Sequence, residues 1–455
     1  MLVNLPVTLK SRDAQPLAQR ELSTSNVFPF NAPREFSVNR RQMLAGLGMA
    51  FVQPMALSET PSTRGSPLEN KNVLYGRRTL PVGIRSRRVA TSTGVTLHVL
   101  EAGYESRTAP CVVLLHGFPE LGYSWRNQLL PVARAGFHVV APDLRGYGRS
   151  LTQPVQYNDD LLPYSMLNRV NDVVGLVRAL GHETAAAIVG HDWGSPTAQW
   201  CARVRPDIFR SVVSLSTPFL TAPTLPLGVA DDRGRAQDDA DIDKALAALS
   251  RPRKHYFTYS ASNHANDDMW HAPQGVHDLL RAMYHFKSGD WEGNKPFALK
   301  SWSASELARM PDYYIMDLHK GIAETMAAEM PSKQQIADCT WITEEDLRVY
   351  SSEFTRTGFQ GGLNYYRVAN DARLGAELKA FSGRTIDVPA CYIGGKRDWA
   401  TYQSPGAFES MRAACSQLRS VHLIEQAGHS LAEERPQEVN AALLEFLIAA
   451  RTASV

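Results

Sequence analysis

Short apolar runs alternate with helical patterns from about residue 86 onwards, and this alternation limits the fold more than any other feature of the sequence. Seven runs have the length and composition of strands: Val95–Glu101, Cys111–Leu115, His138–Ala141, Ala185–Val189, Ser211–Leu215, Val388–Ile393 and Ser420–Ile424. Between the third and fourth runs, apolar residues recur at helical spacing from Leu167 to Leu180, and Pro436 begins a further helical pattern. Strands that alternate with helices predict an α/β protein whose mostly parallel sheet is flanked by helices.

Residues 220–385 interrupt this alternation. They have helical patterns, are rich in polar and aromatic residues, and include an acidic stretch at 231–243. We therefore expect an inserted, mainly helical cap lobe that divides the sheet domain into a first part at 86–219 and a second part at 386–455. The acidic stretch is expected to be a solvated surface loop. The spacing of its carboxylates does not suit a metal site.

The first 60 residues differ from the rest of the chain. The segment before Arg40 is rich in Pro, Ser and Asn and has no periodicity. Arg40–Arg41 precedes a short apolar run with glycines, and Ala56–Ser58 offers the small residues that a signal peptidase accepts. Residues 1–60 therefore resemble a twin-arginine export signal, followed by a linker at 61–85. We expect export to the periplasm or medium; the alternative is a disordered tail on a cytoplasmic protein.

The composition is that of an ordinary globular protein: 44% of the 455 residues are hydrophobic, 21% are charged, and the formal net charge is +2. This balance gives no indication of a nucleic-acid partner. No apolar run reaches the length of about 18 residues that a membrane span requires. The five cysteines, which are Cys111, Cys201, Cys339, Cys391 and Cys415, include no C-x-x-C pair. They predict free thiols rather than a disulfide framework or a zinc site.

The stretch I-V-G-H-D-W-G-S at residues 188–195 places an aspartate at the centre of a predicted strand–turn–helix. Glycines stand two residues before and after Asp192, as a strained turn requires, and the turn directs the Asp192 side chain out above the sheet. The helix that follows aims its amide dipoles at the same place, which favours negative charge there. A carboxylate nucleophile suits displacement at a saturated carbon, because the alkyl ester it forms can then be cleaved by water.

Two further polar residues follow predicted strands in the C-terminal part of the chain. Asp398 comes after Val388–Ile393, and His429 comes after Ser420–Ile424. Nucleophile, acid and histidine thus each follow the carboxyl end of a strand, where open parallel sheets place their sites. We expect His429 to activate the water that cleaves the ester and Asp398 to orient the imidazole.

Several stretches resemble motifs of the α/β-hydrolases: L-L-H-G-F-P-E (114–120), A-P-D-L-R-G-Y-G-R-S (141–150), V-G-H-D-W-G (189–194) and E-Q-A-G-H (425–429). Together with H-G-F-P-E, the stretch G-G-L-N-Y-Y-R (361–367) resembles the epoxide hydrolase branch. The resemblance covers residues 86–450 and implies an α/β-hydrolase fold with a cap and an activity that opens epoxides to vicinal diols. The inserted lobe is longer than is usual in this branch, and 264–302 is part of the surplus.

Hydrolysis of an ester on Asp192 places negative charge on its carbonyl oxygen. Two backbone N–H groups are expected to form the oxyanion hole: that of Trp193, directly after the nucleophile, and that of Phe118 in H-G-F-P. The resemblance also implies a cis peptide bond before Pro119. Asp143 and Arg145, in the stretch P-D-L-R-G-Y-G, are expected to be structural residues that hold the loop beside the site.

Epoxide opening requires a proton donor for the emerging alkoxide, and a phenol is protonated at neutral pH. The resemblance places one donor at Tyr366, the second tyrosine of N-Y-Y-R. It places the other at Tyr256 in H-Y-F-T-Y, where Tyr259 is the alternative. No metal or organic cofactor is expected, because nucleophile, base and acid are all side chains.

Two other functions compete with epoxide opening. A haloalkane dehalogenase would share the aspartate nucleophile and could use the Trp193 indole N–H for the halide, but it needs no pair of tyrosines. A non-catalytic ligand-binding member of the fold would be expected to lack part of the triad. A fluoroacetate-type dehalogenase would place arginine at position 193, and a serine esterase would need a G-x-S-x-G motif that the chain lacks. The aromatic residues of the lobe suggest a small apolar substrate with an aryl group; they include Tyr256, Trp270, Trp302 and Trp341.

Overall fold

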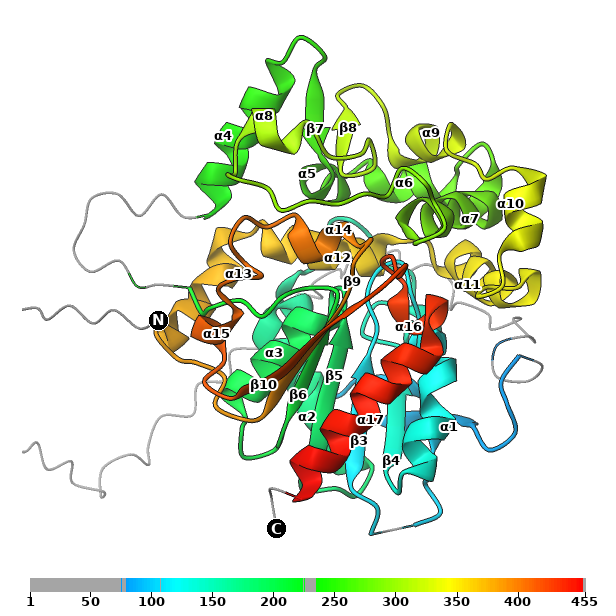
Figure 1. Ribbon diagram of the computed structural model, residues 1–455, viewed down its shortest axis with the longest axis vertical. Helices are drawn as coiled ribbons and strands as arrows, with labels where there is room; N and C mark the ends of the chain where they lie inside the picture. Colours follow the sequence, from blue (N-terminus) through cyan, green and yellow to red (C-terminus); the bar gives the residue numbers. More distant parts are fainter. Residues whose placement is uncertain (1–74, 76–78, 107, 224, 226–234, 453–455) are drawn as a thin grey trace, which may run out of the picture. The chain divides into compact units, whose positions relative to one another are not determined.

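The structure is a computed structural model that describes residues 75, 79–106, 108–223, 225 and 235–452 (Figure 1). The Arg40–Arg41 pair, Ala56–Ser58 and most of the predicted linker at 61–85 lie outside the described residues. In the described ranges, no helix combines the length and the apolar character needed to cross a membrane.

An eight-stranded sheet forms the centre of the fold, in the order β1-β2-β4-β3-β5-β6-β9-β10. The strands are β1 (Arg85–Ala90), β2 (Thr96–Ala102), β3 (Cys111–Leu115), β4 (His138–Pro142), β5 (Ala185–His191), β6 (Val212–Leu215), β9 (Ala390–Gly395) and β10 (Leu418–Ile424). From β4 to β10 every neighbouring pair is parallel. The central strands β3, β6 and β9 are buried along their whole length, as the apolar runs in the sequence predict for strands covered on both faces.

Helices cover the sheet on both faces (Figure 1). Helix α1 (Arg126–Arg134) packs against α17 (Pro436–Thr452), and α2 (Met166–Ala179) packs against α3 (Gly194–Val204). The structure therefore confirms the α/β fold class and the seven predicted strands. It adds β1, which the sequence did not predict, because only one of its six residues is buried and no apolar pattern marks it. Strands β1 and β2 pair antiparallel, as do β2 and β4.

The chain between β6 and β9 forms the cap, which is mainly helical. Its helices are α4 (Arg235–Ala247), α5 (Tyr256–Ser260), α6 (Ala265–Trp270), α7 (Gly275–Lys287), α8 (Ala304–Leu307), α9 (Ile322–Ala327), α10 (Lys333–Asp338), α11 (Glu344–Thr357), α12 (Gln360–Ala369) and α13 (Ala372–Ala376). Strands β7 (Arg253–His255) and β8 (Ile315–Asp317) form a separate antiparallel pair. The hydroxyl of Tyr284 on α7 donates to the carbonyl oxygen of Pro119 at 2.7 Å, so the cap contacts the segment that follows β3.

The prediction of a surface loop at 231–243 is wrong from Arg235 onwards, because this part of the acidic stretch belongs to α4. Alanine favours helix, and Leu246 anchors the end of α4 by being fully buried. The prediction of free cysteines is confirmed: all five are unpaired, and four of them are buried.

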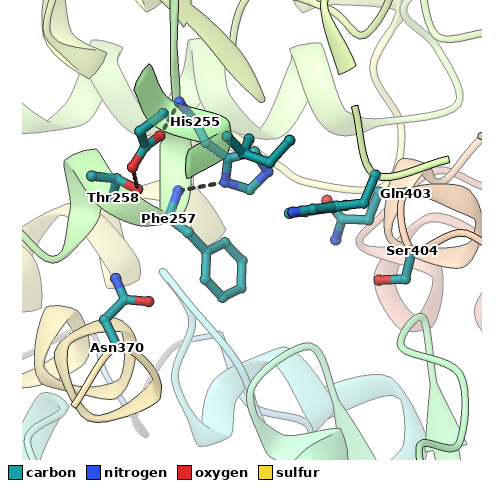
Figure 2. Close-up of a pocket in the computed structure, with 9 residues that line it drawn as sticks. His255, Phe257, Thr258, Asn370, Gln403 and Ser404 are labelled. Atoms are coloured by element: carbon teal, nitrogen blue, oxygen red, sulfur yellow. Dashed lines mark hydrogen bonds between the residues drawn. The ribbon is translucent and has the colours of Figure 1, made fainter. Parts of the chain in front are cut away.

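A cavity opens between the cap and the segment that follows α14 (Trp399–Tyr402) (Figure 2). It holds about 460 Å³ of empty space, including the open solvent at its mouth. Its lining is mixed in polarity and includes His255, Phe257, Trp302, Asn370, Gln403 and Ser404. The cavity therefore offers both ring surfaces and hydrogen-bonding groups to a small molecule.

The loop at 141–150 is organised by the buried carboxylate of Asp143. This carboxylate accepts hydrogen bonds from the Tyr75 hydroxyl, the Gly122 and Arg149 backbone N–H groups and the His98 ring. Burial alone would raise the pKa of Asp143, but the His98 charge and the hydrogen bonds from His98 and Tyr75 outweigh it and lower the pKa to about 2. The predicted structural role of Asp143 is confirmed.

Arg145 has the structural role that the sequence predicts for it. Its guanidinium makes a bidentate pair with Asp172 on α2, with N–O distances of 2.6 and 2.7 Å. The loop that follows β4 is thereby fixed to a helix that covers the sheet.

Replacing Asp143 by asparagine should destabilise the protein by about 3 kcal/mol at neutral pH, because an amide cannot accept all four hydrogen bonds. A lowered carboxyl pKa contributes stability above its usual value of 3.8, and that contribution is lost as the pH falls toward 2. The difference in free energy of unfolding between wild type and Asp143→Asn, measured by urea unfolding, should therefore decrease by about 2 kcal/mol as the pH is lowered from about 4 to about 2. Asp207→Asn is the control, since that side chain is 62% exposed; an equal loss in the control would contradict this account.

Candidate active site

Asp192 occupies a tight turn between β5 and α3. Its backbone is in the left-handed region, with φ = 48°. A methyl group on Gly190 would lie 2.2 Å from the Gly194 carbonyl oxygen, and one on Gly194 would lie 2.2 Å from that of Leu115. Only glycine fits at both positions, so the turn holds the Asp192 carboxylate beyond the end of β5 at the start of α3.

One side of the Asp192 carboxylate is bound by backbone. The N–H of Phe118, in the segment after β3, donates to Asp192 Oδ1 at 2.8 Å. The peptide bond between Phe118 and Pro119 is cis, as the resemblance implies. The Trp193 N–H follows Asp192 directly in the chain, and its part in an oxyanion hole stays a prediction.

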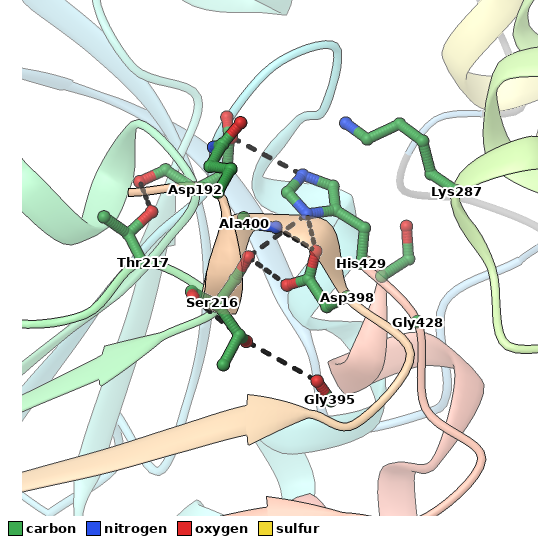
Figure 3. A network of polar contacts seen from close by, with 12 residues as sticks. Asp192, Ser216, Thr217, Lys287, Gly395, Asp398, Ala400, Gly428 and His429 are labelled. Atoms are coloured by element: carbon green, nitrogen blue, oxygen red, sulfur yellow. Dashed lines mark hydrogen bonds and ion pairs between the residues drawn. The ribbon is translucent and has the colours of Figure 1, made fainter. Parts of the chain in front are cut away.

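The other side of the carboxylate faces His429 (Figure 3). His429 Nε2 lies 3.4 Å from Asp192 Oδ2, and His429 Nδ1 lies 3.0 Å from Asp398 Oδ1. Asp398 also accepts hydrogen bonds from the Ala400 backbone N–H at 2.9 Å and from the Ser216 hydroxyl. The structure thus brings Asp192, His429 and Asp398 together in a line, although they come from three separate strand ends.

The charges of this group are interdependent. Burial would raise the pKa of Asp192, but the hydrogen bond and the charge of His429, followed by the charge of Lys287, hold it well below its usual value. Burial and the charge of Lys287 would lower the pKa of His429, but Asp398 and Asp192 raise it to about 9. At neutral pH the resting site therefore contains an ion pair between a carboxylate and an imidazolium.

Two of the predicted tyrosines lie together beside the nucleophile. The Tyr366 ring on α12 packs edge-on against Trp193, with ring centroids 4.9 Å apart, and its centroid is 6.2 Å from that of Tyr256. The Tyr259 hydroxyl, in contrast, donates to Asp268 within the cap. Burial raises the pKa of Tyr256 and of Tyr366 well above 10, so both phenols are protonated at neutral pH. These positions favour Tyr256 over Tyr259 as the partner of Tyr366.

The four aromatic residues that suggested an apolar substrate lie in different surroundings. Tyr256 is in the site, and Trp302 lines the cavity of Figure 2. The indole of Trp270 instead donates to the Thr355 carbonyl oxygen, and that of Trp341 donates to Asp290. Both indoles are thus held by hydrogen bonds within the cap.

Sequence reasoning missed a second layer of polar residues behind the triad. His191 Nε2 lies 2.7 Å from the carbonyl oxygen of His429, and His191 Nδ1 lies 3.0 Å from Glu120 Oε2. Glu120 also accepts the Gly117 N–H at 2.9 Å. The motifs H-G-F-P-E and G-H-D-W-G contain both residues, which was the available signal. No motif marks Ser216 or Lys287, the other two residues that the sequence did not reveal.

The described residues offer no resident metal site: among them, no three His, Cys, Asp or Glu side chains are arranged to hold an ion. The groups at the site are instead a carboxylate, an imidazole with its own carboxylate, a backbone N–H donor and two phenols. These are the parts needed for nucleophilic displacement followed by hydrolysis.

The α/β-hydrolase fold family matches residues 110–436, which include every one of these groups. The chain belongs to this family. Within it, the epoxide hydrolase branch is indicated by relatives named epoxide hydrolase A and epoxide hydrolase B, both from Mycobacterium tuberculosis. Epoxide hydrolase A is 34% identical to this chain over 80% of this chain and 98% of its own length. Epoxide hydrolase B is 32% identical over 79% of this chain and 97% of its own length. The chain is therefore a hydrolase of the epoxide hydrolase branch.

Solved structures give the same result. An epoxide hydrolase from an endophytic Streptomyces is 32% identical, with a TM-score of 0.65, over 82% of this chain and 97% of its own. Epoxide hydrolase A from Mycobacterium thermoresistibile is 30% identical, with a TM-score of 0.61, over 80% of this chain and 98% of its own. The branch thus agrees with the predicted one.

The His429 imidazole should titrate near pH 9 in the resting enzyme, because two carboxylates stabilise its charged form. Asp192→Asn removes one of these charges, so the titration should move to lower pH by about one unit or more. Nitrogen-15 NMR of the imidazole measures both values. Glu425→Gln, at a side chain that is 72% exposed, should leave the titration unchanged. An unmodified enzyme whose His429 titrates below about pH 7 would contradict the ion pair.

Proposed function

We propose that this enzyme opens epoxides to vicinal diols through an ester on Asp192. The observation that carries the proposal is the position of the Asp192 carboxylate, with Oδ1 on the Phe118 N–H and Oδ2 facing His429. The relatives named epoxide hydrolases support the same activity. The proposed roles are nucleophile for Asp192, base for His429, orienting acid for Asp398 and proton donors for Tyr366 and Tyr256.

In the first step, Asp192 Oδ2 forms a bond to one carbon of the epoxide as the bond between that carbon and the epoxide oxygen breaks. A phenol of Tyr366 or Tyr256 gives its proton to this oxygen, so the products are a hydroxyalkyl ester and a phenolate. The two rings are close enough to face one epoxide, with centroids 6.2 Å apart. A donor in this position contributes about 10²- to 10⁴-fold to the rate.

In the second step, water cleaves the ester. The imidazolium first gives its proton to the phenolate, and the neutral His429 then takes a proton from water as the water oxygen adds to the Asp192 carboxyl carbon. The negative charge develops on Oδ1, where the Phe118 N–H already donates at 2.8 Å. When the ester bond breaks, the remaining water proton goes to the leaving oxygen, and the Asp192 carboxylate forms again beside the imidazolium.

Haloalkane dehalogenation is the competing function, since it uses the same nucleophile. A halide leaving group takes no proton, so that reaction gives no purpose to two buried phenols beside the carboxylate. The positions of Tyr366 and Tyr256 therefore favour an epoxide. The Phe257 ring, 5.1 Å from the Tyr366 ring and part of the cavity lining, supports a route from that cavity to the nucleophile for a small, mainly apolar substrate (Figure 2).

His429→Gln should allow ester formation but block its release, because the base for water is removed while Asp192 remains. Mass spectrometry after mixing with excess epoxide should find a stable adduct on the peptide that contains Asp192. In ¹⁸O-water, the wild-type enzyme should carry label in the Asp192 carboxylate after one turnover. Asp192→Asn is the control, which should form no adduct and no diol. Full steady-state turnover by the His429 variant would reject the two-step scheme.

Changing Tyr366 and Tyr256 together to phenylalanine should slow ester formation from an epoxide by about 10²-fold or more. Displacement from an alkyl bromide should change little, since bromide needs no proton. Stopped-flow measurement of ester formation with both substrates tests the assignment, and Tyr259→Phe is the matched control because its hydroxyl is engaged by Asp268. Equal losses on epoxide and bromide, or a Tyr259 variant as slow as the double variant, would contradict the assigned donors.

A further inference from the structure

A buried lysine of the cap lies beside the triad, and the proposed chemistry leaves it without a role. Lys287 is the last residue of α7, and only 6% of its surface is exposed. Figure 3 shows its side chain extended toward the His429 imidazole. Burial of an ammonium is costly unless neighbouring charges or hydrogen bonds compensate it, so its position requires a physical reason.

The backbone at Lys287 is fastened to the loop that carries His429. The His429 N–H donates to the Lys287 carbonyl oxygen at 2.8 Å. A methyl group on Gly428 would lie 2.4 Å from the same oxygen, so the two segments are in direct contact. The Glu434 carboxylate accepts N–H groups from both segments, Gly289 and Gly428, each at 2.8 Å. The backbone at Lys287 is therefore held against the loop that carries the imidazole.

Burial lowers the pKa of Lys287, and three carboxylates from different elements oppose this by stabilising the ammonium: Asp192 after β5, Asp398 after β9 and Glu120 after β3. The Tyr313 ring lies 5.3 Å from its Nζ. Among the described residues, however, no carboxylate lies within the 4.0 Å that defines an ion pair with Lys287. Its charge is thus shared by the site and is not neutralised by one partner.

His429 is surrounded by titratable groups on every side. Asp192 and Asp398 contact its two ring nitrogens, and the His191 ring centroid lies 5.0 Å away. Lys287 is the cation that approaches from the cap, and among the surrounding charges its effect on the pKa of His429 is the largest and lowers it. Asp192 and Asp398 together raise the pKa of His429, and their combined effect outweighs burial and the charge of Lys287 in the resting enzyme.

We propose that Lys287 is a positioning residue for ester hydrolysis, whose charge drives the proton off His429 once Asp192 has become an ester. This inference rests on the proposed function. Ester formation removes the negative charge of Asp192, while Asp398 and Glu120 remain to stabilise the ammonium of Lys287 against its burial. Repulsion by Lys287 then favours transfer of the imidazolium proton to the phenolate left by the first step, which produces the neutral base that water needs. No proton or charge is gained or lost in this transfer.

Lys287→Met removes the charge and keeps a side chain of similar length, whereas Lys287→Arg keeps the charge. Ester formation and ester hydrolysis are measured separately by stopped flow with an epoxide between about pH 6 and pH 10. In Lys287→Met, the pH below which the rate of ester hydrolysis falls should be higher by about one unit. The hydrolysis rate should therefore be about tenfold lower than in the wild type at acidic pH and nearly unchanged at alkaline pH. Lys287→Arg should retain the wild-type profile. Lys295→Met, at an exposed lysine of the same segment, is the matched control and should also retain it.

A Lys287→Met enzyme whose hydrolysis rate falls equally at every pH would overturn the proposal, because that pattern indicates a structural role. A profile that is unchanged, with KM raised only for epoxides that carry a carboxylate, would also overturn it and would assign Lys287 to substrate recognition. Mass spectrometry of the His429→Gln enzyme separates these results from a failure of the proposed function. An Asp192 adduct in that enzyme shows that the ester forms, whatever the pH profile of the Lys287 variants.

Discussion

The whole site depends on one carboxylate held between a backbone N–H and an imidazole. Asp192 can occupy this place because β5 turns into α3 without room for a side chain at Gly190 or Gly194. The turn gives one oxygen to the Phe118 N–H and leaves the other facing His429. In the proposed reaction this arrangement would have one oxygen already bound to a hydrogen-bond donor and the other free to attack, and such preorganisation stabilises charge in a transition state.

The sheet and the cap supply different parts of the chemistry. Strand ends provide Asp192, Asp398 and His429, the groups to which we assign the formation and cleavage of the ester. The cap provides the phenols of Tyr366 and Tyr256, which we propose as proton donors, and the ammonium of Lys287, to which we assign a positioning role. Since the same fold can support many reactions, the groups that the cap places beside Asp192 are those that would distinguish one reaction from another.

Much of this arrangement could be predicted from the sequence. Central parallel strands are buried on both faces and leave continuous apolar runs, so both the strand order along the chain and the residues after each strand could be identified. Strand β1 leaves no such run, and the direction of β2 depends on pairing that a sequence pattern does not contain. The acidic stretch at 231–243 was expected to be a loop, but from Arg235 onwards it belongs to α4, in which alanines and the buried Leu246 favour a helix. Lys287 could not be found, because a lysine at a helix end is ordinarily solvated and only the tertiary contact with the His429 loop buries it.

The attachment of Lys287–Gly289 to the histidine loop also limits how the active site can open. Backbone atoms meet there with no space for even one methyl group at Gly428, and Glu434 ties both segments together. Any movement of the cap away from the sheet domain beside His429 would have to break these contacts, whereas the cavity that Trp302 and Phe257 line with Gln403 is already open.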